Sequence, residues 1–489
     1  MTTSKRDLTR IRHNTKIVAT LGPGSNNVEL LEDMIRIGGL NVVRFNFSHG
    51  TPEFHRENAE IVREAARRAG REIAILADLQ GPKIRVGKIA GGSIQLNQGE
   101  KLVLDAALDG EGTREAVGLD YRNLPDDVKA GDVLWLDDGL LTLTVDSVEG
   151  SRIITTVENS HVLKSNKGIN KRGGGLSAGA LTEKDFRDLK TAIAIGCDYL
   201  AVSFVKSAED LHTARAKVEE EMKGSSAVRP GLVSKIERVE AIENLDEIIL
   251  ASDGIMVARG DLAVEVGHAA VPALQKRMIR RARELRRFSI TATQMMESMI
   301  TNPVPTRAEV SDVANAVLDG TDAVMCSAET AVGAYPFETV RQMAIIAAAA
   351  EAEQDSLNGV EDEYGEEPVS TNLAIASGAV DIARAVNAKA IVALTESGST
   401  AFEVSRHSIQ LPIYALTPSV SAQRRMAMYR GVRPLMIATS KDHETAINEV
   451  EAMLLERGVL AKGDLFIMTS GSRMRESGST NMLQVLTVE

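Results

Sequence analysis

Short apolar segments alternate with longer amphipathic ones along the first part of the chain. The apolar segments lie at 16–21, 40–47 and 71–79, and amphipathic stretches occupy 28–38 and the residues after Thr51-Pro52. A threonine before a proline is typical of the first turn of a helix. Buried strands that alternate with helices indicate parallel βαβ units. The N-terminal part of the chain therefore predicts an α/β fold.

The pattern changes after Gly81-Pro82. From there to residue 176, alternating apolar and polar positions are broken by Gly and Asp turns, and little of this stretch has helical periodicity. We interpret 82–176 as an inserted β-rich domain, in the form of a β-barrel-like lid. Three consecutive glycines at 173–175 suit a flexible hinge at its far edge, and Thr182 with Asp185 resembles a capping box that starts a helix.

The strand-and-helix alternation then resumes. Five further strands are predicted, at 199–204, 231–237, 254–261, 289–294 and 323–329. Together with the three before the insertion they make eight. Eight βα units predict a (β/α)8 barrel, which we assign to residues 1–81 and 177–351.

We interpret an acidic, turn-rich stretch at 352–370 as a linker. Beyond it, helical and strand patterns alternate again as far as the C-terminus, beginning with a helix at 372–386. Further helices are expected at 399–407, 420–430 and 443–457. The pattern predicts a third domain, an open α/β unit, and we place the whole C-terminal region at 352–489.

Polar residues recur where the predicted barrel strands end, which is where barrel enzymes place their catalytic groups. They follow six of the eight strands. The set comprises Arg44, Asn46, Ser48, His49, Asp78, Lys83, Arg85, Lys235, Glu237, Arg259, Asp261, Thr293 and Glu329. One acidic residue at a strand end is usually a turn or cap residue, and a Lys-x-Glu pair is usually a surface ion pair. Their coincidence at six strand ends instead favours one site.

The residue types at these strand ends indicate phosphoryl transfer. Lys235 and Glu237 lie two residues apart on one predicted strand, so their side chains face the same side. Glu237 and Asp261 supply two hard oxygen ligands, a typical protein share for Mg²⁺. Arg44, Arg85 and Lys235 supply positive charge for a phosphate, as phosphoryl transfer requires.

Composition excludes several other classes. The chain of 489 residues has a formal net charge of −12, which argues against nucleic acid and anionic membranes as partners. Its two cysteines are too few for a disulfide framework or a metal cluster. No secretory signal and no run of about 18 apolar residues is present, so we expect a cytoplasmic protein. P-loop, HExxH and CxxC motifs are absent from the sequence.

The strand-end segments closely resemble those of the pyruvate kinase family. TKIVATLGP, NVVRFNFSHG, DLQGPKIR, NKGIN, SKIER, ARGDL, ITATQMMESMI and SAETA occur in the family's order, from about Thr15 to the C-terminus. The resemblance implies transfer of a phosphoryl group from phosphoenolpyruvate to ADP, giving pyruvate and ATP in the last step of glycolysis. It also implies Mg²⁺ or Mn²⁺ as cofactor and a homotetramer.

The resemblance also implies a role for each site residue. Arg44, Lys235, Gly260, Asp261 and Thr293 look like the phosphoenolpyruvate site. Catalysis would rest on Lys235, Thr293, Arg44, Ser327 and Glu329. The divalent metal would be held by Glu237 and Asp261. The family's K⁺ site corresponds to Asn46, Ser48, Asp78 and the carbonyl of Leu79. Nucleotide contacts would come from Asn46, His49, Arg85 and Lys167.

Lys83 departs from the family pattern, which often has Glu in its place. A fixed ammonium supplies charge that a bound K⁺ would otherwise bring. We therefore hypothesise weak or absent K⁺ dependence, although the ligand positions Asn46, Ser48 and Asp78 are retained.

A loop of the C-terminal domain resembles the family's effector site. TESGST offers small hydroxyl groups and backbone amides at a strand-to-helix turn, which suit a phosphate. The residues concerned are Thr395, Ser397, Gly398, Ser399 and Thr400. A phosphorylated small-molecule activator is expected, with a sugar monophosphate favoured over a sugar bisphosphate or AMP. A second segment, 470–481, is expected to close over this loop. A plain helix cap is the alternative for the loop.

The sequence leaves two rival functions open. One is another metal-dependent barrel enzyme acting on pyruvate or phosphoenolpyruvate, such as an aldolase or mutase, which would lack the inserted domain. The other is a catalytically silent sensor of phosphorylated metabolites, against which the intact Lys235, Glu237, Asp261 and Thr293 argue.

Overall fold

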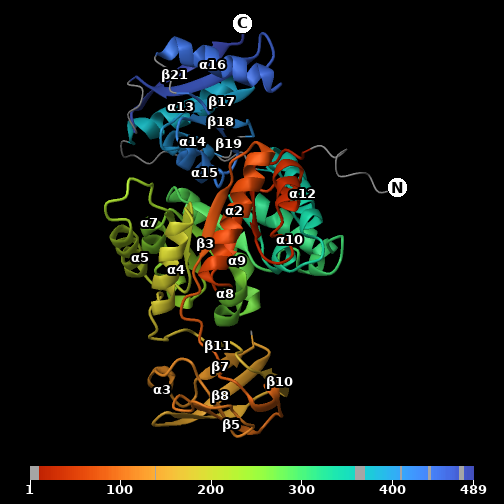
Figure 1. Cartoon of the computed structure of the whole chain (residues 1–489), viewed down its shortest axis with the longest axis vertical. Coiled ribbons are helices and arrows are strands. Elements are labelled where there is room, and N and C mark those ends of the chain that lie inside the picture. The colour runs from red at the N-terminus through yellow and green to blue at the C-terminus, as the bar shows by residue number, and fades with distance from the viewer. Residues whose placement is uncertain (1–9, 138, 358–368, 408–409, 439–441, 473–477) are drawn as a thin grey trace.

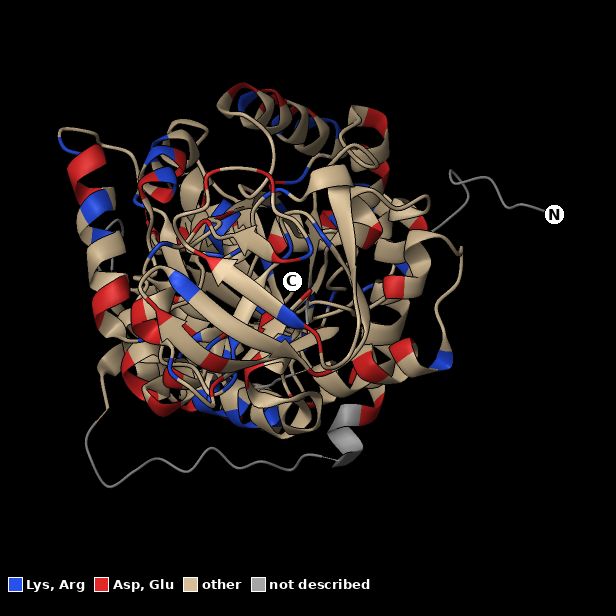
Figure 2. Cartoon of the chain, turned by 90° about the horizontal axis from the view of Figure 1, so that it is seen from below, with Lys and Arg blue, Asp and Glu red and all other residues tan. Residues whose placement is uncertain are grey.

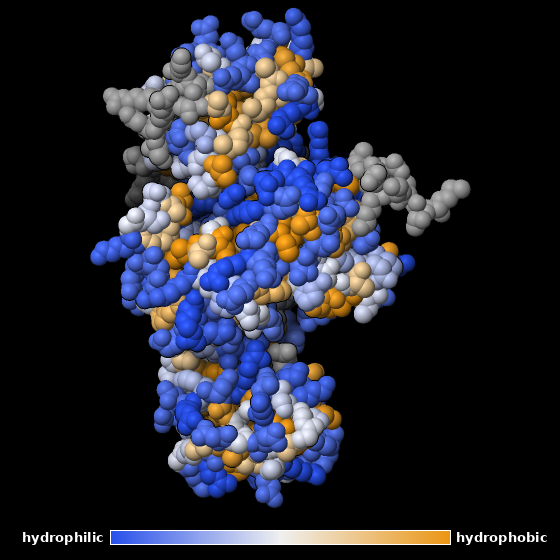
Figure 3. Space-filling model, viewed as in Figure 1, coloured by the Kyte–Doolittle hydropathy of each residue, from blue (hydrophilic) through white to orange (hydrophobic). Residues whose placement is uncertain are grey.

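Three units lie along the long axis of the molecule (Figure 1). The structure is a computed structural model that describes residues 10–137, 139–357, 369–407, 410–438, 442–472 and 478–489. The barrel forms the middle, the inserted domain one end and the C-terminal domain the other. A narrow waist separates the barrel from the inserted domain (Figure 3).

Eight parallel strands close into the predicted barrel, in the order β1-β16-β15-β14-β13-β12-β3-β2. Their bounds are β1 (Lys16–Thr20), β2 (Val42–Asn46), β3 (Ala74–Asp78), β12 (Tyr199–Val202), β13 (Gly231–Ile236), β14 (Gly254–Ala258), β15 (Phe288–Ala292) and β16 (Ala323–Cys326). Almost every strand residue is buried, because side chains fill the interior on one face and helices cover the other. The (β/α)8 prediction is confirmed.

The helices of the barrel unit surround the strands. They are α1 (Val28–Asp33), α2 (Pro52–Ala69), α4 (Glu183–Ala194), α5 (Ala208–Glu221), α6 (Val239–Glu243), α7 (Leu245–Ala251), α8 (Arg259–Val266), α9 (Val271–Glu284), α10 (Arg307–Leu318), α11 (Ala328–Ala331) and α12 (Pro336–Leu357). The Thr182–Asp185 capping box is present at the start of α4. Basic and acidic positions are interspersed along the outer helices (Figure 2).

The inserted domain is a small β unit with its own apolar core. Its strands are β4 (Ser93–Leu96), β5 (Lys101–Asp105), β6 (Ala116–Gly118), β7 (Val133–Leu136), β8 (Leu141–Glu149), β9 (Arg152–Val157), β10 (His161–Lys164) and β11 (Ile169–Lys171). Six form one sheet, β10 pairs with β4, and α3 (Leu124–Asp127) is a single short turn. Gly173, Gly174 and Gly175 after β11 all have φ between 76° and 83°, a region that other residues rarely enter.

The C-terminal domain is an open five-stranded sheet in the order β19-β18-β17-β20-β21. Its elements are α13 (Thr371–Ala385), β17 (Ala390–Leu394), α14 (Ser399–Ser405), β18 (Ile413–Thr417), α15 (Val420–Met426), β19 (Val432–Met436), α16 (His443–Glu456), β20 (Leu465–Gly471) and β21 (Thr480–Thr487). Only β21 runs antiparallel to its neighbour. The predicted open α/β domain is confirmed.

Some predicted boundaries differ from the structure. Helix α12 continues to Leu357, so the first residues of the expected linker 352–370 are helical, and 358–368 lie outside the described residues. The helix expected at 420–430 ends at Met426. The stretch 28–38 changes from an α-helix to a π-helical turn at Met34. Helix ends depend on local hydrogen bonds that an apolar pattern does not specify.

No helix among the described residues is long and apolar enough to cross a membrane.

Candidate active site

The C-terminal ends of β2 and β3 bring opposite charges together at the mouth of the barrel. Arg44 donates from Nε to Asp78 Oδ2 over 2.6 Å and from Nη1 to the Thr20 hydroxyl over 3.0 Å. Asp78 is only 1% exposed. Burial alone would raise the pKa of Asp78, but the charges of Lys235 and Arg44 overcome this and lower it. Arg44 is thereby fixed in position before any anion arrives.

Lys235 lies at the centre of the site. Its ammonium donates to Ser203 Oγ over 2.7 Å and lies 2.9 Å from Glu237 Oε1 and 3.4 Å from Asp78 Oδ1. Burial works against its positive charge, but Asp78 and then Glu237 raise the pKa of Lys235 above its ordinary value. Lys235 therefore stays charged at neutral pH in a largely buried position.

Glu237 and Asp261 offer carboxylate oxygens beside this ammonium. Glu237 is buried and accepts a hydrogen bond from Phe204 N at Oε2 over 2.8 Å, while Asp261 belongs to the first turn of α8. Burial raises the pKa of Glu237, and the nearby negative charge of Asp261 raises it further. A buried carboxylate and a partly exposed one that repel each other fit a shared divalent cation.

Glu237 and Asp261 alone would give a metal ion an incomplete set of ligands. Among the described residues, no group of three or more His, Cys, Asp or Glu side chains could hold a metal ion. This suits Mg²⁺, which usually keeps several waters and substrate oxygens beside one or two carboxylates.

Thr293 occupies a strained backbone position next to Gly260. Its φ is +69°, a left-handed conformation that costs a β-branched residue energy. The Thr293 hydroxyl accepts from Gly260 N over 2.8 Å and donates to the Ala292 carbonyl over 2.6 Å. Arg259 donates to the Thr293 carbonyl over 2.6 Å, which helps to hold this turn. Strain of this kind clusters at functional sites.

Lys83 reaches into the same site from the segment that leads to the inserted domain. Its ammonium lies 3.1 Å from Asp261 Oδ1, and both side chains are about one-quarter exposed, at 27% and 24%. The residue that departs from the family pattern thus contacts one of the two carboxylates assigned to the metal.

The predicted monovalent-cation positions lie at neighbouring strand ends. Asn46 and Asp78 are paired in the register of β2 and β3, and Asn46 Oδ1 accepts from Ser48 N over 3.1 Å. The Leu79 carbonyl accepts from Ser203 Oγ over 2.7 Å. Asp78 is itself a member of the ion pair with Arg44, and Asn46 and Leu79 lie next to it. Three of the four predicted ligands are therefore neighbours.

The predicted nucleotide contacts are spread between the two domains. Arg85 donates to the Asn166 carbonyl over 3.0 Å, next to Lys167. The Lys167 ammonium pairs with Asp137 over 2.7 Å inside the inserted domain. His49 is exposed in the turn before α2. The structure brings Arg85 and Lys167 into one region, and no hydrogen bond or ion pair joins His49 to them among the described residues.

Ser327 and Glu329 lie after β16. Glu329 is fully buried and accepts from Ser327 N over 2.6 Å and from Met296 N over 3.2 Å. These bonds hold the Glu329 carboxylate against the loop that carries Thr293.

In the loop predicted to bind an effector, Gly398 N donates to Thr395 Oγ1 over 2.9 Å, and Ser397 donates to Ser399 over 3.3 Å. Gly398 has a φ of +89° and precedes the first residue of α14. Thr400 is buried and hydrogen-bonded to Thr480 over 2.6 Å. Part of the segment 470–481, expected to close over this loop, lies outside the described residues.

The sequence analysis missed Thr20 and Ser203. Thr20 orients Arg44, and Ser203 links Lys235 to the Leu79 carbonyl. A Cβ on Gly81 would lie 2.8 Å from Ser203 Cβ, so the backbone also packs closely here. The available signal was a single hydroxyl at the end of an otherwise apolar strand, in KIVATL and YLAVSF.

A barrel with buried Lys, Arg and paired carboxylates at the carboxyl ends of its strands defines a class: enzymes that move phosphoryl groups with the help of a divalent metal. Comparison with known protein families identifies one family within this class. The family model for the pyruvate kinase barrel domain matches residues 12–340, and that for the pyruvate kinase alpha/beta domain matches 373–486. The chain belongs to the pyruvate kinase family.

Relatives and solved structures agree over the full length. The chain is 50% identical to pyruvate kinase II of Salmonella typhimurium over 487 residues, covering 99% of this chain and 100% of the relative. It is 48% identical to the pyruvate kinase of Haemophilus influenzae over 487 residues, with 99% and 100% covered. A crystal structure of a pyruvate kinase from Cryptosporidium parvum superposes with a TM-score of 0.89 at 34% identity, covering 98% of this chain and 96% of that one.

These relationships establish the activity. The chain is an enzyme with pyruvate kinase activity, whose substrates phosphoenolpyruvate and ADP follow from the family. The family generally depends on Mg²⁺ and K⁺.

Proposed function

We propose that Lys235, Arg44, Glu237, Asp261 and Thr293 perform the transfer of the phosphoryl group from phosphoenolpyruvate to ADP. The observation that carries the proposal is the position of Lys235, held between Ser203, Asp78 and Glu237. A positive charge fixed in a buried site stabilises charge on a migrating phosphoryl group without reorganisation during the reaction.

Each group has a distinct task in this proposal. A divalent metal held by Glu237 and Asp261 would supply Lewis-acid charge to the phosphate and enolate oxygens. Lys235 neutralises negative charge on the phosphoryl group in transit. Arg44, already oriented by Asp78 and Thr20, binds the phosphate of the substrate.

Loss of the phosphoryl group leaves an enolate that must take up a proton to become pyruvate. The Thr293 hydroxyl is our candidate for delivering this proton, directly or through water. The Ser327–Glu329 pair is assigned to the same route, because Glu329 is hydrogen-bonded to Met296 N in the Thr293 loop.

The inserted domain is proposed to close over the site with the nucleotide. Arg85 and Lys167 would contact the ADP phosphates, and Asn46 and His49 would complete that site. Gly174 and Gly175 offer a hinge, and Gly175 N donates to Glu240 on the barrel over 2.6 Å. Closure would exclude water from the transfer step.

We infer that K⁺ is required weakly or not at all. Lys83 supports this, because its ammonium already lies 3.1 Å from Asp261. The test compares wild type and Lys83→Glu in tetramethylammonium buffer with and without added K⁺. We expect wild type to retain most activity and the variant to become K⁺-dependent. Loss of nearly all wild-type activity without K⁺ would refute the idea.

An activator is proposed for the loop that contains Thr395, Ser397, Gly398, Ser399 and Thr400. A phosphorylated small molecule, preferably a sugar monophosphate, would accept hydrogen bonds from its hydroxyls and amides. Titration of activity at low phosphoenolpyruvate with sugar monophosphates, sugar bisphosphates and AMP tests this, with Ser399→Asp as the variant that repels phosphate.

A homotetramer is proposed by family resemblance, and sedimentation checks it.

One assay separates the proposed function from its rivals. Purified protein is supplied with phosphoenolpyruvate, ADP and Mg²⁺, and ATP and pyruvate are both measured. Equal formation of the two products supports the proposed site. Consumption of phosphoenolpyruvate without formation of ATP, or no turnover, would contradict the roles proposed for these residues.

A further inference from the structure

A histidine and a lysine that have no task in the proposed transfer hold the turn between β2 and α2. The turn, residues 46–50, contains three residues proposed to bind K⁺ or nucleotide: Asn46, Ser48 and His49. The histidine is His55, near the start of α2, and the lysine is Lys184, in the first turn of α4. The two helices thus reach the same turn from different parts of the chain.

The amide groups of the turn are bonded within the turn and to the neighbouring strand. Asn46 accepts from Ser48 N at its side-chain Oδ1 over 3.1 Å and from His49 N at its carbonyl over 3.2 Å. Phe47 N donates to the Asp78 carbonyl at the end of β3 over 2.9 Å. The carbonyls of Phe47 and His49 are bound instead by side chains of the two helices.

His55 binds the carbonyl of His49. The His55 side chain is buried, and its Nε2 lies 3.0 Å from the His49 carbonyl oxygen. Because a carbonyl oxygen only accepts, Nε2 carries the proton and donates. Burial holds the pKa of His55 below its ordinary value, so the ring is neutral at pH 7. Its Nδ1 is buried without a hydrogen-bond partner among the described residues, so the bond to the turn is its hydrogen bond there.

Aromatic rings fix the direction of this N–H group. The imidazole stacks on the ring of Phe47, with centroids 4.0 Å apart and an angle of 23° between the planes, and Phe54 meets it edge-on at 5.6 Å. A Cβ on Gly50 would lie 2.6 Å from Phe54 Cδ1 and 3.3 Å from His55 Nε2, so the turn packs directly on these rings. The imidazole is therefore held in one orientation before a substrate binds.

Lys184 binds the carbonyl of Phe47. Its ammonium donates to that oxygen over 2.6 Å and to Asp188 Oδ2, one helical turn further along α4, over 2.5 Å. The next residue of the helix, Asp185, accepts from Gly81 N over 3.0 Å, where the chain leaves the barrel for the inserted domain. The first turn of α4 therefore connects the turn to the segment that leads into the lid.

We propose that His55 and Lys184 are positioning residues for ADP, which they serve by fixing the turn that carries its contacts. The Phe47 carbonyl belongs to the peptide unit before Ser48, and the His49 carbonyl to the unit after His49. Because each unit is planar, holding both oxygens restricts the backbone between them. A turn that is already ordered costs less entropy when a ligand binds. The inference rests on the proposed function, in which Asn46 and His49 contact the nucleotide.

Steady-state kinetics with ADP and phosphoenolpyruvate varied in turn, at fixed saturating Mg²⁺ and K⁺, test the proposal. His55→Phe keeps a ring that stacks on Phe47 and removes the donor. We expect KM for ADP to rise about 3–10-fold, the range that loss of one hydrogen bond gives. KM for phosphoenolpyruvate should not change, because Arg44 is held separately by Asp78 and Thr20. Lys184→Met should cause a smaller rise, since the Lys184 side chain is 39% exposed.

A rescue variant and two matched controls separate positioning from a loss of packing. His55→Gln supplies an N–H group in place of Nε2 and should recover most of the ADP affinity that His55→Phe loses. The controls make the same substitutions at exposed positions: His212→Phe in α5 and Lys190→Met in α4, whose side chains are 61% and 59% exposed. Both should have the KM of wild type for ADP. His55→Phe keeps a buried ring and is expected to fold, so the test does not depend on Lys184→Met.

His49→Ala distinguishes failure of this inference from failure of the nucleotide assignment, because it removes a proposed contact and keeps the backbone carbonyl. If it raises KM for ADP and the variants of His55 and Lys184 do not, the positioning role is wrong and the assignment stands. If none of the three raises it, both are wrong. A rise without His49→Ala supports positioning through Asn46 or Ser48 and removes His49 from the nucleotide site.

Three other outcomes would also count against the proposal. Equal rises in KM for ADP and for phosphoenolpyruvate in His55→Phe would show general damage to the site. A KM for ADP in His55→Gln as high as in His55→Phe would show that the hydrogen bond has no part in positioning. A rise in His55→Phe without one in Lys184→Met would overturn the role assigned to Lys184.

Discussion

At the mouth of the barrel, Arg44 and Lys235 lie against Asp78 and Glu237, whereas at its base Lys16 and Arg71 face other cations. Both places are lined by strand ends and are largely withdrawn from water. The carboxylates at the mouth raise the pKa of Lys235. At the base, burial and then repulsion by Arg71 and Arg433 outweigh the charge of Glu351 and lower the pKa of Lys16.

The difference shows two ways of using buried positive charge. Paired cations at the mouth are fixed in place, as the proposed stabilisation of charge during phosphoryl transfer requires. Cations at the base that form no ion pair among the described residues, such as Lys16 and Arg71, repel one another and so oppose folding. The following variants test whether cations at the mouth and cations at the base differ in this way.

The largest expected effect concerns a cation at the base that does have a partner. Arg406 of the C-terminal domain is buried and forms a bidentate pair with Asp322 of the barrel, one bond being 3.0 Å long. Arg406→Gln leaves Asp322 buried without its counter-charge. We expect a loss of about 3–5 kcal/mol in the free energy of unfolding, measured by urea denaturation.

Arg280→Gln is the control for that measurement, because Arg280 is exposed and pairs only loosely with Glu284, over 3.7 Å. It should change the free energy of unfolding by less than about 0.5 kcal/mol. Similar stability of Arg406→Gln and Arg280→Gln would show that pairing at the base is unimportant.

At the mouth, Lys235→Met removes the charge assigned to the migrating phosphoryl group. We expect kcat to fall by about 10²–10³, or ~2.7–4 kcal/mol in activation free energy, while phosphoenolpyruvate still binds measurably. Steady-state kinetics and fluorescence titration of substrate check this. Near-normal turnover would reject the assignment of Lys235.

Glu237→Gln keeps the shape of the side chain and removes one metal carboxylate. The half-saturating concentration of Mg²⁺ should rise by at least the ~10–100-fold that loss of an outer-shell partner costs. Activity measured against Mg²⁺ and Mn²⁺ gives this number directly. Ser48→Ala, which leaves both proposed metal carboxylates in place, should not shift it, so an equal shift in both variants would argue against Glu237 as a ligand.

The contrast between mouth and base also explains what the sequence could predict. Lys235 and Glu237 lie two residues apart at the end of β13, and Asp78 ends β3. Asp261 follows β14 in the first turn of α8, so the rule that barrel sites form where strands end was enough to group these residues. Ser203 and Thr20 escaped notice, because one hydroxyl in an apolar strand has no distinctive pattern.

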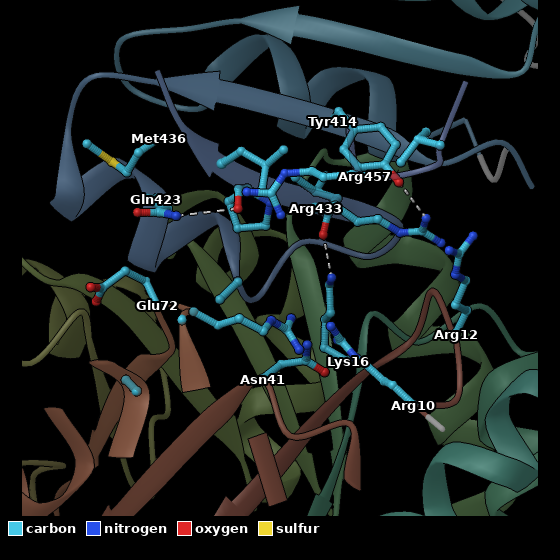
Figure 4. Close-up of a pocket in the computed structure, with 18 of the residues that line it drawn as sticks. Arg10, Arg12, Lys16, Asn41, Glu72, Tyr414, Gln423, Arg433, Met436 and Arg457 are labelled. Carbon is cyan, nitrogen blue, oxygen red and sulfur yellow. Dashed lines mark hydrogen bonds between the residues drawn. The ribbon is translucent and has the colours of Figure 1, made fainter. Parts of the chain in front are cut away.

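A cavity of about 690 Å³ between the base of the barrel and the C-terminal domain (Figure 4) could not be predicted in the same way. Arg10, Arg71 and Arg433 are far apart in the chain and meet only because the C-terminal domain packs on the base of the barrel. That packing depends on contacts such as Lys16 with the Val432 carbonyl and Arg424 with Glu72, which no local periodicity encodes. Whether a segment forms a strand or a helix depends largely on its local sequence. How two domains pack depends on contacts between distant parts of the chain.

The smallest expected effect is the sharpest test of the comparison. Arg433→Gln, in protein free of added anions, removes one member of a group of mutually repelling cations. It loses a hydrogen bond to Tyr414 and relieves repulsion on Lys16 and Arg71, so these changes oppose each other. We expect the free energy of unfolding to stay within about 0.5 kcal/mol of wild type, or to rise. A loss near that of Arg406→Gln would mean that Arg433 is neutralised within the protein and that the base resembles the mouth.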